Sequence, residues 1–527
     1  MSPIAHLTDQ HQLKKIPSND NAQYIVQKFG GTSLGKYPLN IVENVIIPHS
    51  RTHKIVSVCS ARSLDTKAGG TTSRLLSVAN DICKPDSSPI ETIMYEIETE
   101  HIEAVHGYIK CSRIARSIIE DIRSDCRRVT ALLTAARALG QLSVSCLERI
   151  VSTGEKLSAR LLCAILQDQG VWAEYVDLSE CAGLPEDQIS QHEMYNQVSQ
   201  RLAARVRICA ARVVVVTGYF GRVPGGLLNS VGRGYTDLCA VLLTAGIPQS
   251  ELQVWKELDG LFTADPRRVR TARLLDTLSP AEAAELTFYG SEVIQSLAMA
   301  QAACRGIPIT VKGVMNPNGR GSLVTSAETT SRWAAPPLKM GFNKIGDLGD
   351  SSREDAVGVP GRPVALTTKT KVVVIRVRPM EQCLSHNFFA KIFMILDKWR
   401  LSVDLMSTSA AQVSMALSSK TIHIPSDAGN MQDTGDVHLQ GAIQDLRLSG
   451  CVELIPKMAI VSVIGRRIQQ TPDLASSIFV TLGKNNIQTV MICQGASEIS
   501  ISCVIPEPHI DRAICVLHEG LFACLAG

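Results

Sequence analysis

Apolar residues fall into two kinds of run along the chain, and their alternation predicts a parallel sheet covered by helices. Mainly apolar stretches occur at 24–28, 53–60, 252–256 and 307–312, and 212–216 (RVVVV) is an unbroken β-branched run after its first residue. Such runs are typical of strands that are buried on both faces. Helical periodicity dominates 90–167, which is rich in Ala, Leu, Arg and Glu. Strands that alternate with helices predict an α/β domain, 23–328, with an open and mainly parallel sheet.

The pattern then changes. The segment 329–366 lacks periodicity and is rich in Pro, Gly, Ser and Asp, so we interpret it as a linker. After it, the order strand, helix, strand, turn, strand occurs twice, with a period of about 85–90 residues from Val372 to Ala459. This repeat predicts a tandem duplication of a small α+β module, the copies being 367–445 and 446–527.

Composition limits the class of protein without identifying it. The 527 residues are enough for two to four domains, and the 45% apolar and 20% charged fractions are those of an ordinary globular protein. The formal net charge is only +3. Nothing in this balance calls for nucleic acid or a membrane surface as a partner.

The cysteines and the N-terminus indicate a cytoplasmic protein. The 16 cysteines are scattered singly, without a CxxC pair, which argues against a zinc site and against a disulfide-stapled secreted domain. Residues 1–22 form a polar tail, expected to be flexible, that resembles neither a signal peptide nor an Arg-rich transit peptide. No apolar run reaches the roughly 20 residues of a membrane span.

The first candidate motif is Lys28-Phe29-Gly30-Gly31-Thr32-Ser33, which follows the first predicted strand. The two glycines allow backbone N–H groups to approach an anion, and Lys28 supplies a positive charge for a phosphoryl group in transit. A tight turn with a solvated lysine explains the same letters about equally well. The GxxxxGK[ST] spacing of a Walker loop is absent.

Two short motifs have both a structural and a functional interpretation. Gly69-Gly70-Thr71-Thr72-Ser73 places hydroxyls beside flexible backbone, which suits a carboxylate or a phosphate, although such stretches are more often plain loops. Ser152 and Glu155 fit a capping box, S-x-x-E, at a helix start. The functional alternative makes Glu155 the anchor for a substrate ammonium.

The run from Thr217 to Asp237 is the longest glycine-rich stretch, and it follows a β-branched strand. Such a loop can be moulded around a ligand. Arg233 can hold a carboxylate through two parallel hydrogen bonds. Asp237 lies at the predicted start of a helix, where it either caps that helix or orients Lys28.

The last motif runs from Trp255 to Arg267 and contains Asp-Gly and Asp-Pro, which are turn signals. A surface loop is therefore the simpler interpretation. The combination of Lys256, Phe262 and Arg267 could instead stack a base and hold phosphates.

Taken in order, these motifs resemble the amino-acid kinase superfamily and its aspartate kinase branch. The resemblance covers about 26–522 and is carried by KFGGTS, GTTSRL, the Gly154-Glu155 pair, VPGGLLNSVGRGYTDLCA, QVWKELDGLFTADPR, AAELTFYGSEV and VMNP. The C-terminal repeat resembles the paired ACT modules of that family. Its LSHNFFAKIF, VDLMSTS and CQGASE stretches are similar to fungal-type versions.

The resemblance implies ATP-dependent phosphorylation of the L-aspartate side chain to 4-phospho-L-aspartate, the first step toward threonine, methionine and, where present, lysine. It assigns phosphoryl-charge stabilisation to Lys28 and positioning to Asp237. Glu155 would bind the aspartate ammonium and Arg233 its α-carboxylate, with help from Thr72, Gly234 and Thr236. The nucleotide would be lined by Lys28, Phe29, Gly30, Gly31, Lys256, Glu257, Phe262, Arg267 and Asn316.

The same resemblance implies Mg²⁺ bridging the ATP phosphates without a dedicated protein metal site. It also implies a homo-oligomer assembled through the ACT modules. Effector contacts would involve Ser409, Gln412, Gln488 and Gln494.

This chain departs from the family pattern at two places. Gln295-Ser296-Leu297 stands where the family has His-Pro-Phe, in a loop expected near the active site. Ala410-Ala411-Gln412 stands where fungal relatives have Glu-Val-His, and 488–494 departs as well. We therefore expect altered feedback, with weak or no inhibition by threonine, as would suit a specialised pathway.

Two other functions fit the same letters. One is a regulatory paralogue that senses an amino acid and has lost turnover. The other is a related amino-acid kinase that acts on a different carboxylate. The full set Lys28, Glu155, Arg233 and Asp237 argues against the first, and the Arg233 loop favours aspartate over the second.

Overall fold

The computed structural model describes residues 23–64, 69–82, 90–183, 190–223, 226–289, 293–326, 362–379, 386–409, 412–418, 437–466, 468, 471–494 and 499–522. The predicted tail and nearly all of the predicted linker lie outside these residues. The described chain divides into two units. The first contains the residues up to Leu261 and those from Val293 to 326, and the second contains 262–289 and the residues from 362 onward.

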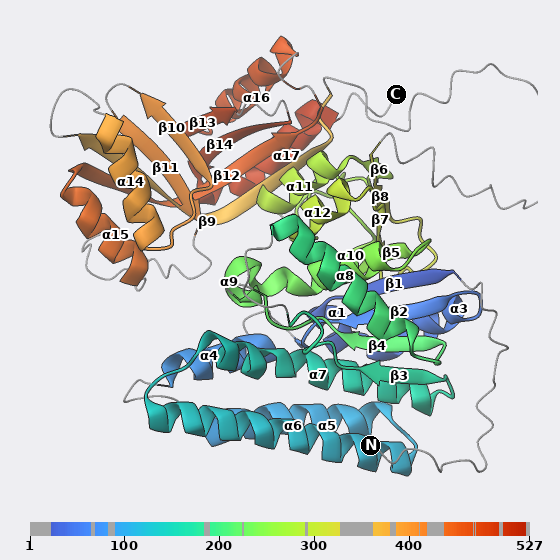
Figure 1. Cartoon of the computed structure of the whole chain (residues 1–527). Coiled ribbons are helices and arrows are strands. Elements are labelled where there is room, and N and C mark those ends of the chain that lie inside the picture. The colour runs from blue at the N-terminus through green and yellow to red at the C-terminus, as the bar shows by residue number, and fades with distance from the viewer. Residues whose placement is uncertain are drawn as a thin grey trace, which may run out of the picture. The chain divides into compact units, whose positions relative to one another are not determined.

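A mainly parallel sheet forms the centre of the first unit (Figure 1). Its strands are β1 (Tyr24–Phe29), β2 (Lys54–Cys59), β3 (Ala173–Val176), β4 (Val213–Thr217), β5 (Glu251–Lys256), β7 (Ile309–Gly313) and β8 (Ser322–Val324). They lie in the order β3-β4-β2-β1-β5-β7-β8, and all neighbours pair in parallel except β7 and β8. The predicted α/β class and its five core strands are confirmed, whereas β3 and β8 were not predicted.

Helices cover this sheet. They are α1 (Gly31–Lys36), α2 (Pro38–Asn40), a π-helix (Ile41–Ile46), α3 (Ile47–Ser50), α4 (Thr71–Asp81), α5 (Ile90–Tyr108), α6 (Ser112–Leu139), α7 (Val144–Asp168), α8 (Gln191–Arg207), α9 (Leu227–Ser230), a 3₁₀ turn (Gly232–Gly234), α10 (Tyr235–Gly246) and α12 (Ser296–Cys304). Helix α7 packs on β3 and β4, and α5 and α6 form an antiparallel pair beside it (Figure 1). No helix in the described part of the chain is long and apolar enough to span a bilayer.

The alternation of side chains along β1 places the first candidate residue. Ile25 and Phe29 belong to the apolar cluster that includes the inner face of α7. Successive strand residues face opposite sides of a sheet, so Lys28 lies on the other side, against α10. A charged residue at the end of an apolar strand is thereby directed into the protein interior.

The second unit contains an antiparallel sheet in the order β10-β11-β9-β12-β14-β13. Its strands are β9 (Ala365–Pro379), β10 (Leu405–Ser409), β11 (Gln412–Ser418), β12 (Gly450–Ile464), β13 (Met491–Gln494) and β14 (Ser500–Pro506). Its helices are α11 (Pro280–Tyr289), α14 (His386–Lys398), α15 (Val437–Arg447), α16 (Pro472–Lys484) and α17 (Ile510–Phe522), with a short strand β6 (Thr277–Leu278) before α11.

Backbone conformation confirms the internal repeat. Lys371 and Arg400 adopt φ values of 57° and 52°, and Lys457 and Asn486 adopt 57° and 54°. The second pair lies 86 positions after the first. Residues other than glycine seldom adopt a positive φ. Two such pairs separated by the same number of positions therefore mark equivalent points in two copies of one module.

The two copies share their longest strands. The C-terminal half of β9 pairs with β11 and with the start of β12, whereas its N-terminal end, 365–369, pairs with the end of β12. Each module thus takes one strand from the other copy's part of the chain. The predicted module limits fall inside β9 (366/367) and inside α15 (445/446), so they divide the sequence at points where the fold is continuous.

Residues 262–289 lie between β5 and α12 in sequence, within the predicted domain 23–328, but they pack in the second unit. Helix α11 contacts β9 and β12. The imidazole of His518 on α17 lies 2.9 Å from the Thr263 hydroxyl and 3.1 Å from the Thr271 hydroxyl. Strand–helix alternation cannot show which unit a connecting segment packs on, because that depends on contacts far away in sequence.

Candidate functional site

Lys28 and Asp237 form a buried ion pair at the C-terminal end of β1. The Lys28 Nζ lies 2.7 Å from Asp237 Oδ1, and the two side chains are only 6% and 8% exposed. Asp237 Oδ2 accepts a hydrogen bond from the Gln295 N–H at 3.0 Å. Burial opposes ionisation of this carboxyl, but Lys28, Lys256 and the hydrogen bonds outweigh it and hold its pKa below the usual value. Asp237 therefore fixes the Lys28 ammonium, as one of its two predicted roles requires.

Glu155 reaches the same end of the sheet from α7. It is buried, its Oε1 accepts a hydrogen bond from the Thr236 hydroxyl at 2.6 Å, and its Oε2 accepts one from the Tyr219 N–H. The capping-box interpretation is wrong, because α7 begins at Val144 and Ser143 is its N-cap, accepting from the Cys146 N–H. Glu155 lies in the middle of the helix, so it is not needed to form the helix end.

The pKa of the Glu155 carboxyl is close to neutral pH. Burial raises its pKa to about 7, although the hydrogen bonds from Thr236 and Tyr219 and the charge of Lys28 act in the opposite direction. A cation bound against this carboxylate would favour the ionised form further. The residue is thus suited to recognise an ammonium in a site that excludes water.

The two glycines after Phe29 have different roles. A Cβ on Gly31 would lie 2.1 Å from the Ala61 carbonyl oxygen, so packing alone demands glycine there. A Cβ on Gly30 would meet only the Ser33 hydroxyl, at 3.9 Å, so packing leaves Gly30 free to face a ligand. Phe29 is fully buried and stacks on Trp255 with ring centroids 6.4 Å apart. Its side chain is therefore a core residue, and a role for Phe29 toward the nucleotide stays a prediction that would fall to its backbone.

Part of the predicted nucleotide set gathers beside the ion pair. The Ser33 hydroxyl donates to Glu257 Oε1 at 2.7 Å, which connects α1 to the end of β5. The charge of Lys256 helps to lower the pKa of Asp237. Asn316, after β7, donates to Asp259 at 3.1 Å.

Phe262 and Arg267 stay predictions as nucleotide contacts. Both belong to the second unit, where Phe262 forms a β-bridge with Leu274. The Arg267 guanidinium pairs with Asp265 at 2.9 Å.

The remaining substrate candidates lie around Glu155. Thr72 is half-buried in the first turn of α4. This helix packs closely on α7, because a Cβ on Gly154 of α7 would lie 3.2 Å from the methyl group of Thr71. A Cβ on Gly234 would lie 2.4 Å from the Gln295 side chain, so that turn needs glycine for packing. The backbone of Arg233 lies in the 3₁₀ turn just before α10, and its side chain is outside the described part of the structure.

Sequence reasoning missed three residues of the site: Tyr219, Glu148 and the backbone role of Gln295. Glu148 and Glu155 are seven positions, about two turns, apart on α7, so both face the same side. That spacing was the available signal. Tyr219 carried none, because its partners are 64 and 71 positions away.

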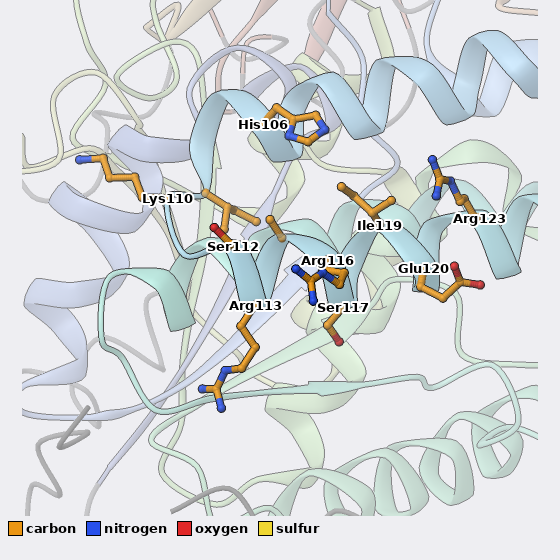
Figure 2. Close-up of a pocket in the computed structure, with 11 residues that line it drawn as sticks. His106, Lys110, Ser112, Arg113, Arg116, Ser117, Ile119, Glu120 and Arg123 are labelled. Atoms are coloured by element: carbon orange, nitrogen blue, oxygen red, sulfur yellow. The ribbon is translucent and has the colours of Figure 1, made fainter. Parts of the chain in front are cut away.

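A surface hollow of about 950 Å³ lies elsewhere, at the junction of α5 and α6 (Figure 2). Four of its labelled side chains are cationic: Lys110, Arg113, Arg116 and Arg123. None of its lining residues takes part in the contacts of Lys28, Glu155 or Asp237. We assign it no role in the site.

Comparison with known proteins gives concordant results over nearly the whole chain. Residues 23–313 match the amino acid kinase family, and 461–521 match an ACT domain. The chain is 39% identical to the aspartokinase of Schizosaccharomyces pombe, covering 97% of this chain and 95% of that one. It is 38% identical to the aspartate kinase FUB3 of Gibberella fujikuroi, covering 95% and 98%.

A solved structure of Escherichia coli aspartokinase III, in complex with aspartate and ADP, has a similar fold. Its TM-score is 0.70 at 23% identity, and the match covers 95% of this chain and all of that one.

Proposed function

The chain belongs to the amino acid kinase family, within it to the aspartokinases, and from that membership we propose how its buried groups phosphorylate aspartate. The observation that carries the proposal is the convergence of Lys28, Asp237 and Glu155 at the C-terminal edge of one parallel sheet. Ligands of open α/β sheets bind at that edge. The structures of a related aspartokinase with aspartate and ADP support the same ligands here.

In the reaction, an oxygen of the aspartate side-chain carboxylate attacks the γ-phosphorus of ATP, and ADP leaves with the electrons of the broken P–O bond. The carboxylate is already ionised at neutral pH, so no general base is required. The Lys28 ammonium, fixed by Asp237, stabilises the charge on the transferring phosphoryl oxygens. Catalysis then rests on placement and electrostatics.

Substrate recognition is assigned to the groups around α7 and α10. Glu155 binds the aspartate ammonium, with Thr236 already bonded to its carboxylate, and Arg233 binds the α-carboxylate. Thr72 contributes a hydroxyl from the first turn of α4. An acidic and a basic partner for the ammonium and the α-carboxylate hold the amino acid by its Cα substituents and leave its side-chain carboxylate directed toward ATP.

Nucleotide recognition is assigned to Gly30 and to the ends of β5 and β7, with Lys256, Glu257 and Asn316. Mg²⁺ would be held chiefly by the phosphates and neutralise their charge. Among the described residues, no group of three or more His, Cys, Asp or Glu side chains could hold a metal ion by itself.

The decisive experiment couples ADP release to NADH oxidation and compares aspartate, glutamate and no acceptor. We expect turnover with aspartate and only background with the other two. Equal turnover with glutamate would favour an amino-acid kinase of different specificity. Aspartate binding without any turnover would favour a regulatory paralogue.

Feedback control is expected to be weak. Ser409 and Gln412 face each other across β10 and β11. Gln488 lies before β13 and Gln494 is its last residue, and both side chains are exposed. The side chains that fungal relatives carry near these turns are replaced by neutral ones, so an effector loses charged partners. We expect threonine to inhibit this enzyme less than about twofold when it is titrated beside the S. pombe aspartokinase, because lost charged contacts cost roughly tenfold or more in affinity. Equal sensitivity of the two enzymes would contradict this.

Self-association through the second unit is a further part of the proposal. Phe393 and Met394 on α14 are 52% and 70% exposed, and contiguous exposed apolar side chains are typical of interfaces. We expect light scattering to report at least a dimer. Replacing both residues by Glu should shift the mass to the monomer, whereas Glu at exposed Leu139 of α6 should leave it unchanged.

A further inference from the structure

Glu148 is a second buried carboxylate on α7, and the proposed chemistry does not use it. It is only 2% exposed. Its Oε2 accepts a hydrogen bond from the Tyr219 hydroxyl at 3.1 Å, and its Oε1 accepts one from the Leu228 N–H at 3.1 Å. A buried carboxylate is costly unless its oxygens are satisfied, so both bonds are needed for the folded arrangement.

These two bonds hold both ends of the segment that leads to the substrate site. Tyr219 follows β4, and Leu228 lies in α9, just before the turn that contains Arg233 and the helix that contains Thr236 and Asp237. Between them, Gly226 has φ of 82°, and a Cβ there would lie 2.9 Å from Glu148 Oε1. Only glycine lets the backbone approach the carboxylate this closely.

Tyr219 bonds to both of the buried glutamates of α7, Glu148 and Glu155. Its hydroxyl bonds to Glu148, while its N–H bonds to Glu155. Its ring also contacts Tyr235 edge-on, with centroids 5.9 Å apart, at the start of α10. A shift of Tyr219 would therefore move a donor away from Glu155 and disturb the helix that carries Thr236.

We propose that Glu148 is a positioning residue for the aspartate subsite, acting by holding Tyr219 and Leu228 against α7. The inference rests on the proposed function, since it assigns Glu155 and the Arg233 turn to aspartate. It predicts that Glu148 acts as a hydrogen-bond acceptor and that its charge does not touch the substrate.

The test uses three variants of the full chain: Glu148→Leu, Glu148→Gln and Tyr219→Phe. Glu148→Leu removes both acceptors, and we expect the KM for aspartate to rise about 10- to 100-fold, with a smaller change in kcat and in the KM for ATP, because misplacement affects one subsite. Glu148→Gln can still accept from Leu228 and pair with the Tyr219 hydroxyl, so it should stay within about threefold of wild type. Combining Tyr219→Phe with Glu148→Leu should add little to Glu148→Leu alone.

Two results would overturn the proposal. If Glu148→Gln is as impaired as Glu148→Leu, the negative charge itself acts on the substrate. If Glu148→Leu raises the KM values for aspartate and ATP equally, the residue supports the whole domain rather than one subsite. Thermal unfolding of each variant shows whether it is folded, and hydrogen exchange at the Leu228 amide should accelerate in Glu148→Leu but not in Glu148→Gln.

Aspartate binding measured by calorimetry without ATP separates this inference from the proposed function. A wild-type chain that binds aspartate without turning it over contradicts the proposed function, and the same variants still test the positioning role. Unchanged aspartate affinity in Glu148→Leu would end the inference even if the enzyme is fully active.

Discussion

Replacing Lys28 by Met should lower kcat by about a thousandfold while changing the KM for aspartate little, because the lost ammonium acts mainly on charge that develops in transfer. Stability should fall as well. Asp237 would be left ionised and buried without its partner, and breaking such a pair costs about 3–5 kcal/mol. Steady-state kinetics and thermal unfolding measure the two effects on the same preparation.

The double variant Lys28→Met, Asp237→Asn separates stability from catalysis. It removes the uncompensated charge, so most of the lost stability should return while kcat stays at the level of Lys28→Met. Lys54→Met, at the opposite end of the neighbouring strand, is the matched control and should be fully active. A Lys28→Met enzyme that keeps more than about a tenth of wild-type kcat would show that phosphoryl charge is stabilised elsewhere.

The elements that could be predicted are those whose signal is local. Runs such as RVVVV near 212–216 are long, β-branched and apolar, so burial on both faces follows directly from composition. β3 (Ala173–Val176) is half-polar and short, and it forms a strand mainly because its backbone pairs with β4. Context of that kind is not present in a four-residue window.

The site shows the same division. From the residues alone, pairing of Asp237 with Lys28 was one of two alternatives, and the family resemblance favoured it, since 209 positions separate the two and no local rule links a strand end to a helix start. The Ser152–Glu155 spacing led to a wrong prediction of a helix start, because the same S-x-x-E pattern occurs in a capping box and on the buried face of a helix. Burial decides between the two, and it depends on α4, which packs on α7, and on Thr236 of α10, which donates to Glu155.

The placement of 262–289 in the second unit gives a physical route between regulation and catalysis. This segment begins directly after the residues assigned to the nucleotide and ends just before Gln295, whose N–H bonds to Asp237. It is fastened in the second unit through His518 and through the Thr263 carbonyl, which accepts from the Leu366 N–H at 2.7 Å. A change in that unit can therefore reach both substrates along one covalent connection.

Glu155→Gln should have opposite effects on binding and on stability. The carboxylate that we assign to the aspartate ammonium disappears, so the KM for aspartate should rise about 100-fold, the value of one charge-assisted hydrogen bond in a buried site. The free energy of unfolding should not decrease at pH 8. The Gln oxygen can still accept from the Tyr219 N–H, and the Thr236 hydroxyl can accept from the new amide.

The sign of the pH dependence follows from the raised pKa of Glu155, about 7 against an ordinary 4.5. Between these values the folded chain keeps a proton that the unfolded chain has released, so this group's contribution to stability is full below pH 4.5 and is lost as the pH rises through 7. Glu155→Gln should therefore equal wild type at pH 5 and be the more stable of the two at pH 8. Denaturant unfolding at both pH values measures this.

Activity should follow the same titration in the opposite direction. For wild type, kcat/KM for aspartate should rise with pH through an apparent pKa near 7, because only the ionised carboxylate binds the ammonium, and this limb should vanish in Glu155→Gln. Asp125→Asn is the matched control, since Asp125 is a buried carboxyl on α6 whose pKa is also raised by burial but which pairs with Arg160 away from the site. It should lose stability and keep the aspartate KM, whereas an unchanged aspartate KM in Glu155→Gln would remove Glu155 from the substrate site.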